Sequence, residues 1–153
     1  PLKIVNENYK MTLLDSLRKR IDFLFEVKKE LKLEDVLLIH GRAEDFGQNK
    51  IYREKFDICV SRAVAPLNVL CEYCLPFVKV GGYFAAYKSK NISPEISESE
   101  NAIKKLGGKI AEIREVSLPG TDIVRKIVIV EKCEPTNIKY PRRAGKSGKE
   151  PLV

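Results

Sequence analysis

Apolar runs alternate along the chain with stretches of helical periodicity. Residues 10–14 and the apolar run 36–40 (VLLIH) predict two strands, because strands buried on both faces of a parallel sheet are apolar throughout. Between them, apolar residues recur every three or four positions from 17 to 31, with charges on the other side, which predicts an amphipathic helix. The polar stretch 41–55 is expected to be a loop.

The alternation of strand and helix continues beyond this loop. Two strands and two helices are predicted there: a strand at 56–61, a helix from Pro66 to Leu75, a strand at 83–87 and a helix between Ser93 and Gly107. The Gly107-Gly108 pair is a typical place for the left-handed residue that ends a helix.

The last two predicted strands differ from the others in how they are connected. Residues 109–118 and 124–132 both have strand patterns, and only residues 119–123 separate them. So short a connection has no room for a crossover helix, and it therefore joins antiparallel neighbours. The sequence thus predicts an α/β fold, with a mostly parallel sheet, helices on both faces and a terminal antiparallel hairpin. This is the plan of class I methyltransferases that use S-adenosylmethionine (SAM), a Rossmann-like fold distinct from the all-parallel dinucleotide-binding fold.

Length and composition are typical of one globular domain. The chain has 153 residues, of which 44% are hydrophobic, and a formal net charge of +7 with a pI near 9.2. No apolar run is long enough to cross a bilayer, and the N-terminus has no signal-peptide pattern, so we expect a soluble, cytoplasmic protein without a membrane partner.

The excess positive charge is concentrated at the C-terminal end. Residues 139–153 hold five cations and one acid, so we divide the chain into a catalytic domain, residues 1–138, and a basic C-terminal segment, residues 139–153. Cations in this segment can bind RNA phosphates and an aromatic ring can stack on a base. The alternative is a solvated, disordered end. The candidate RNA-binding residues are Tyr140, Arg142, Arg143, Lys146 and Lys149.

Asp15 lies where a predicted strand ends, which is where open parallel sheets bind ligands. Its carboxylate can accept hydrogen bonds from both hydroxyls of a ribose. The alternative is that Asp15 caps the following helix, and one carboxylate can serve both roles.

Two further polar clusters follow strands in the same way. In GRAED, residues 41–45, a backbone N–H and a small side chain can line an adenine edge while Glu44 accepts from an amino group; the alternative is a solvated acidic turn. Arg62 follows the next strand, where it can face both cofactor and substrate. Its alternative is a surface salt bridge with Glu44 or Asp45. We expect Asp15, Glu44 and Arg62 to converge on one crevice.

Histidine and cysteine add little to the candidate chemistry. His40, the only histidine, is expected to be a strand-end residue rather than a catalyst. Cys71 and Cys74 form a C-x-x-C pair on a predicted helix, but a zinc site normally needs a second ligand pair. We expect these thiols to be reduced, to pack inward and to bind no metal.

Taken in order, the stretches TLLDSLRKRIDFL, HGRAEDFG, FDICVSRAVAPL, GGYFAAYKS and YPRRAGKSGKEPL closely resemble the RsmG family, also called GidB. These bacterial enzymes transfer a methyl group from SAM to N7 of one guanine in 16S ribosomal RNA. The resemblance implies 16S rRNA or the small ribosomal subunit as partner of a monomeric enzyme. It also implies that Asp15 and Ser16 lie near the cofactor ribose, Ala43 and Glu44 at the adenine, and Arg62 at the cofactor pocket as the catalytic residue that faces the substrate.

One part of the family pattern has no counterpart here. The family has an N-terminal helical region, and then a first strand with a glycine-rich loop, just before residues like PLKIV at positions 1–5. We therefore expect the chain to be an N-terminally incomplete version of a longer protein. Two other function classes remain open. A non-enzymatic rRNA-binding or ribosome-assembly factor needs no SAM loop, whereas a nucleotide-dependent oxidoreductase fits the terminal hairpin poorly.

Overall fold

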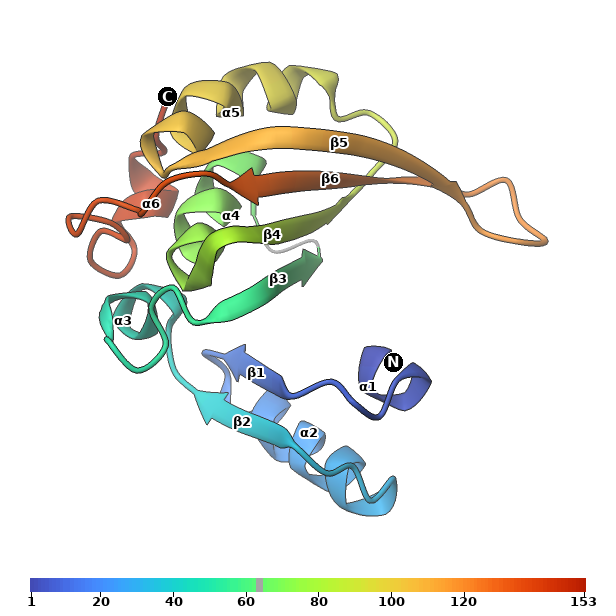
Figure 1. Ribbon diagram of the computed structural model, residues 1–153. Helices are drawn as coiled ribbons and strands as arrows, with labels where there is room; N and C mark the ends of the chain where they lie inside the picture. The colour runs from blue at the N-terminus through green and yellow to red at the C-terminus, as the bar shows by residue number, and fades with distance from the viewer. Residues whose placement is uncertain (63–64) are drawn as a thin grey trace. The chain divides into compact units, whose positions relative to one another are not determined.

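The computed structural model describes residues 1–62 and 65–153. The chain divides into two compact units, residues 1–43 and 44–153. In chain order, the elements in Figure 1 are α1 (Leu2–Val5), β1 (Met11–Asp15), α2 (Arg18–Glu30), β2 (Val36–His40), α3 (Ala43–Gln48), β3 (Phe56–Arg62), α4 (Leu67–Cys74), the 3-10 helix η1 (Leu75–Phe77), β4 (Val78–Lys88), α5 (Ser93–Lys105), β5 (Gly108–Ser117), β6 (Val124–Lys132) and α6 (Lys146–Lys149).

The first unit is a small parallel β-α-β motif. β1 and β2 pair in parallel, from Met11 opposite Val36 to Asp15 opposite His40. Helix α2 buries Ile21, and the amine of Lys28 donates to the carbonyl of Val36 at 2.7 Å. The predicted strands and helix are confirmed here to within a residue or so at each end.

The second unit is built on a four-stranded mixed sheet with the order β3-β4-β6-β5. β3 and β4 are parallel, whereas β6 is antiparallel to both of its neighbours. The predicted terminal hairpin is therefore confirmed. Among the described residues, β1 pairs only with β2 and β3 only with β4, so the strands form two sheets. No described strand pairs with both β1 and β3.

Helices α4 and α5 pack together and form the helical layer of the second unit (Figure 1). The core between this layer and the sheet contains Leu70, Phe84, Ile103 and Val130, each no more than 2% exposed. Tyr83 alternates with Phe84 along β4 and is 41% exposed. Within this unit, helices α4 and α5 thus cover one face of the sheet.

Three local features differ from or confirm the sequence-based expectations. The expected loop at 41–55 contains helix α3, which was missed because six residues give too short a periodic pattern. Strand β4 begins at Val78, earlier than predicted. Gly107 has a φ of +83°, so the predicted left-handed residue after α5 is confirmed.

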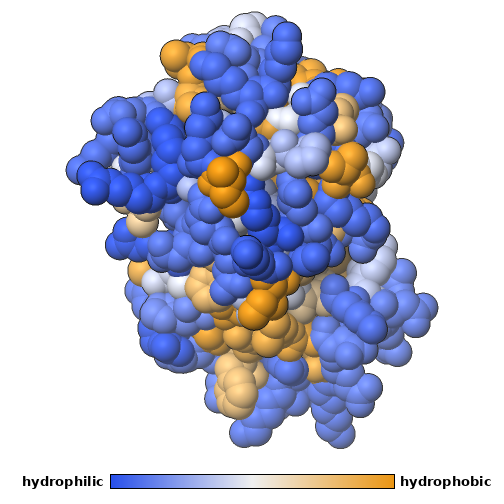
Figure 2. Space-filling view, turned by 60° about the vertical axis from the view of Figure 1, so that its left-hand side comes forward, coloured by the Kyte–Doolittle hydropathy of each residue, from blue (hydrophilic) through white to orange (hydrophobic). Residues whose placement is uncertain are grey.

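The C-terminal residues pack into the second unit, where Tyr140 and Leu152 belong to its hydrophobic core. The face drawn in Figure 2 is mostly hydrophilic, with hydrophobic residues gathered in a few patches. In the described ranges, none of the helices has the length and apolar character that crossing a membrane requires.

Candidate cofactor site and basic surface

Asp15 is the last residue of β1, and its neighbour in register on β2 is His40. The amide of Gly41 donates to the carbonyl of Asp15 at 3.0 Å, so the ladder between β1 and β2 extends to the residue after β2. The Asp15 side chain turns to the start of α2. One carboxylate oxygen accepts from the amide of Leu17 at 2.8 Å, and the other lies 3.1 Å from a guanidinium nitrogen of Arg20.

These contacts keep the Asp15 carboxylate ionised. Burial raises the pKa of Asp15, but the hydrogen bond from Leu17 and the charge of Arg20 outweigh it, so the pKa lies below its usual value. The side chain is 24% exposed, and each oxygen has one protein partner, which leaves further lone pairs for a ligand. Helix α2 begins at Arg18 with Leu17 as its N-cap residue, so Asp15 precedes the cap rather than forming it.

Ser16 and Ala43 lie near the same ends of these two strands. Ser16 directly follows β1, and its carbonyl oxygen lies 3.1 Å from Nε2 of His40. His40 is exposed at the end of β2, so its predicted position as a strand-end residue is confirmed. Ala43 is the first residue of α3, three positions after β2 ends. The first unit therefore has a charged carboxylate, a serine and a small side chain at the carboxyl ends of its strands.

Glu44 belongs to the second unit and is buried, with 8% of its surface exposed. Its Oε1 accepts a hydrogen bond from the amide of Gly145 at 3.0 Å. The alternative of a solvated acidic turn is wrong for Glu44, which instead holds the C-terminal part of the chain. Its other carboxylate oxygen has no hydrogen bond to a described residue, so the predicted contact with an adenine amino group stays a prediction.

Arg62 is the last residue of β3 and pairs in register with Tyr87 of β4. Its side chain is exposed. No ion pair to Glu44 or Asp45 is found among the described residues, and the next two positions, Ala63 and Val64, lie outside them. The convergence of Asp15, Glu44 and Arg62 on one crevice stays a prediction.

The candidate RNA-binding residues divide into two groups. Tyr140 is 7% exposed and belongs to the core, and Arg142 makes a bidentate ion pair with Glu72 of α4. Neither side chain is presented to solvent as base stacking or phosphate binding would require. Arg143, Lys146 and Lys149 are exposed. Lys146 lies 3.6 Å from Glu150, a surface pair that contributes little to stability.

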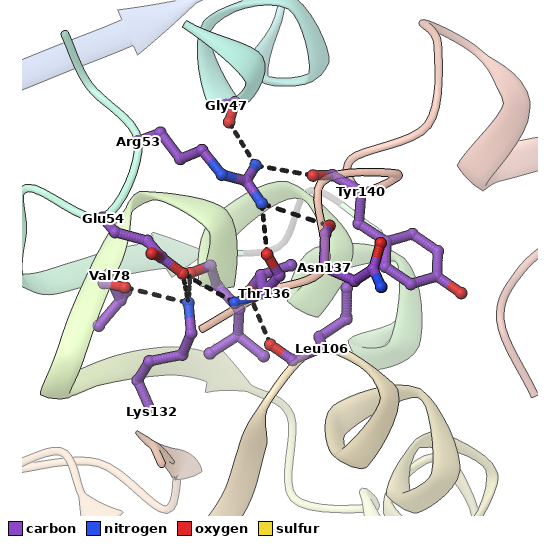
Figure 3. Close-up of polar contacts among 10 residues, drawn as sticks. Gly47, Arg53, Glu54, Val78, Leu106, Lys132, Thr136, Asn137 and Tyr140 are labelled. Atoms are coloured by element: carbon purple, nitrogen blue, oxygen red, sulfur yellow. Dashed lines mark hydrogen bonds and ion pairs between the residues drawn. The ribbon is translucent and has the colours of Figure 1, made fainter. Parts of the chain in front are cut away.

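A buried polar network that sequence reasoning missed joins the end of β6 to the C-terminal residues (Figure 3). The amine of Lys132 is fully buried and donates to the carbonyls of Leu75 and Val78 and to Oε1 of Glu54, at 2.7, 3.1 and 3.1 Å. The same Glu54 oxygen accepts from the amide of Thr136 at 2.7 Å. Burial lowers the pKa of Lys132, although Glu54 opposes this. No sequence signal marks this network, because its members lie far apart along the chain.

The C-x-x-C pair packs as expected. Cys71 is fully buried and Cys74 is 8% exposed, both in the core of the second unit. Burial raises the pKa of Cys71, and a hydrogen bond with Cys59 together with burial raises that of Cys74, so both thiols are protonated at neutral pH. In the part of the chain that the structure describes, no group of three or more His, Cys, Asp and Glu side chains could hold a metal ion.

The fold is similar to that of solved structures, one of them bound to AdoMet and another named as an rRNA methylase. M. jannaschii TYW2 in complex with AdoMet superposes with a TM-score of 0.63 and 17% identity, over 86% of this chain and 62% of that one. An rRNA methylase from Streptococcus thermophilus gives a TM-score of 0.56 and 17% identity, over 82% of this chain and 74% of that one. Similarity at this level of identity shows the class I methyltransferase fold alone.

Sequence comparison gives closer relatives. The chain is 58% identical to the ribosomal RNA small subunit methyltransferase G of Alkaliphilus oremlandii, over 99% of this chain and 64% of the relative. It is 55% identical to that of Brevibacillus brevis, over 100% of this chain and 64% of the relative. The chain thus spans somewhat less than two-thirds of the length of these relatives. A family model described as GidB, rRNA small subunit methyltransferase G, matches residues 1–124, and the chain therefore belongs to the GidB family.

Proposed function

We propose that this chain forms part of a cytoplasmic, monomeric enzyme that transfers a methyl group from SAM to N7 of a guanine in 16S rRNA. Membership of the GidB family supports this proposal, because its curated relatives are named as methyltransferases of small-subunit rRNA. The single structural observation that carries it is the ionised carboxylate of Asp15 at the carboxyl end of a parallel strand.

The residues at the ends of β1 and β2 fit the adenosine half of SAM. Asp15 is charged, partly exposed and has lone pairs left to accept from ribose hydroxyls, with Ser16 beside it. We assign Ala43 and Glu44 to the adenine edge. Oε1 of Glu44 is bonded to Gly145, so Oε2 is the oxygen available to an amino group.

Methyl transfer to guanine N7 needs no strong general base. Guanine N7 has an available lone pair and carries no proton, so the protein residues must position the base and exclude water. When bound, SAM supplies a methyl group on a sulfonium that is already a good leaving group. Arg62, exposed at the end of β3, is our candidate for orienting the guanine nucleotide through its planar guanidinium.

We assign phosphate contacts in 16S rRNA, free or within the small subunit, to Arg143, Lys146 and Lys149. Their exposure supports this assignment. The contacts of Arg142 with Glu72 and the burial of Tyr140 support structural roles for these two residues instead.

A methyl-transfer assay tests the proposed function. The enzyme that contains this chain is incubated with radiolabelled SAM and 16S rRNA or small subunits, and N7-methylguanine is identified by mass spectrometry of the nucleosides. Arg62→Ala should lower the single-turnover rate by about 10²-fold, which is the cost of misplacing a reacting group by about 1 Å. It should leave thermal unfolding unchanged, because the Arg62 side chain is exposed.

Equal single-turnover rates for the unsubstituted enzyme and Arg62→Ala would show that Arg62 has no part in the mechanism. rRNA binding without SAM binding or methyl transfer would favour an rRNA-binding factor over an enzyme.

A further inference from the structure

The guanidinium of Arg53 is the centre of the contacts that hold the C-terminal segment, which from here on includes the three residues before Lys139 and so covers residues 136–153. Nη1 donates to the carbonyls of Gly47 and Tyr140 at 2.9 and 2.7 Å. Nη2 donates to the carbonyls of Thr136 and Asn137 at 2.6 and 3.3 Å. Figure 3 shows the side chain reaching from the turn at residues 51–54 to these four oxygens. One residue thereby joins the end of α3 to three positions of the C-terminal segment.

Helix α3 adds further contacts with the same segment. Nε2 of Gln48 donates to the carbonyls of Ile138 and Pro141 at 3.0 and 2.8 Å. Gly47 lies so close to Pro141 that an added Cβ would come within 2.9 Å of the proline Cγ. At the other end of α3, Glu44 accepts from the amide of Gly145. The backbone of the segment is thus fixed along most of its length.

Three of the five cations of the segment, Arg143, Lys146 and Lys149, take no part in these contacts with α3 and Arg53. Arg53, Gln48 and Glu44 all bind backbone atoms of the segment, whereas the side chains of Arg143 and Lys149 are exposed. A charged surface mounted on a fixed backbone loses less conformational entropy on binding than a flexible tail with the same charges. Arg53, Gln48 and Glu44 therefore fix the backbone of the segment, whereas different residues, Arg143 and Lys149, carry its exposed positive charge.

We propose that Arg53 is a positioning residue for RNA binding: by holding the C-terminal segment on α3, it presents Arg143, Lys146 and Lys149 to the phosphate backbone in a fixed arrangement. This rests on the proposed function, in which rRNA is the partner. Arg53 is partly buried, and its guanidinium N–H groups already donate to carbonyl oxygens. It therefore does not itself bind phosphate. A lysine cannot replace it, because a compact ammonium group cannot reach four oxygens spread around a planar fork.

The test compares Arg53→Lys with the unsubstituted chain. This exchange keeps the net charge, so a change in affinity cannot come from a lost cation. We expect the affinity for protein-free 16S rRNA, measured by filter binding, to fall on the order of tenfold, which corresponds to ordering one or two side chains. The slope of log affinity against log salt should stay unchanged, because the phosphate contacts are the same in number. Hydrogen exchange at the amides of Tyr140 and Gly145 should become faster.

Arg114→Lys is the matched control, since Arg114 makes an exposed pair with Glu112 on β5, and it should change none of these quantities. Arg53→Gln is the second variant and should weaken binding further. Unchanged RNA affinity in Arg53→Lys despite faster exchange would overturn the positioning role. So would a smaller salt slope, which would make Arg53 a phosphate contact. Failure of the unsubstituted chain to bind rRNA would instead contradict the proposed function on which this inference depends.

Discussion

Arg142 and Glu72 form a bidentate ion pair across the second unit. Nε and Nη2 of Arg142 lie 2.8 and 2.6 Å from the two carboxylate oxygens of Glu72, and the backbone amide of Arg142 donates to the same carboxylate at 2.8 Å. The Glu72 side chain is fully buried and that of Arg142 is 18% exposed. A residue whose setting in the sequence suggests RNA binding therefore anchors the C-terminal segment to α4.

We expect Arg142→Ala to destabilise the protein strongly. The substitution leaves the Glu72 carboxylate buried with its main partner removed, and breaking such a pair costs about 3 kcal/mol. Urea denaturation followed by circular dichroism measures the loss. Arg143→Ala is the matched control, because Arg143 is the next residue and is exposed, and its free energy of unfolding should change by less than about 0.5 kcal/mol. Equal effects of the two substitutions would contradict the anchoring role.

The same pair predicts a loss of stability in acid. Burial raises the pKa of Glu72, but its hydrogen bonds with Arg142 and the charge of Arg142 outweigh this, so the folded-state pKa lies below the ordinary value of 4.5. The pair therefore stabilises the fold fully above pH 4.5, and this contribution is lost as pH falls through the lowered pKa.

Glu72→Gln isolates this effect, because glutamine cannot titrate. The difference in unfolding free energy between the unsubstituted chain and Glu72→Gln should be constant near neutral pH and should shrink below pH 4.5. A difference that stays constant down to pH 3 would show that Glu72 does not titrate with a lowered pKa.

Asp15→Asn should weaken SAM binding with little change in stability. Asparagine retains an oxygen for the amide of Leu17 but loses the charge that strengthens hydrogen bonds from ribose hydroxyls. We expect the dissociation constant for SAM, measured by isothermal titration calorimetry, to rise on the order of tenfold. Asp22→Asn, on α2, serves as control. If Asp15→Asn bound SAM with unchanged affinity, Asp15 would not be the residue that binds the ribose hydroxyls.

The exposed cations of the C-terminal segment should control the salt dependence of RNA binding. Replacing both Arg143 and Lys149 with alanine removes two phosphate contacts, so the slope of log affinity against log salt should become shallower by about 1.4 to 1.8. Hydrogen exchange at the amide of Gly145 should not change, because neither side chain holds the segment. An unaltered slope would place the RNA elsewhere on the protein.

The tertiary contacts explain why the candidate residues divide as they do. Arg142 and Glu72 are 70 residues apart along the chain, and Glu44 and Gly145 are 101 apart. Nothing local to YPRR distinguishes the arginine that pairs with a buried carboxylate from its exposed neighbour. Lys132 is a similar case, since its end-of-strand position suggests exposure but its amine is fully buried against η1 and β4.

The sequence by itself determined the order of the six strands and the three longer helices, the antiparallel pairing of the last two strands, the left-handed residue at Gly107 and the family. These depend on local periodicity, connection length and motif spacing, all of which can be read along the chain. Only the tertiary structure decided that α3 forms, that Glu44 is buried, that Arg142 pairs with the buried Glu72, and that Arg53 holds the C-terminal segment. Those outcomes depend on which backbone groups the fold brings within hydrogen-bonding distance, and no local pattern encodes that.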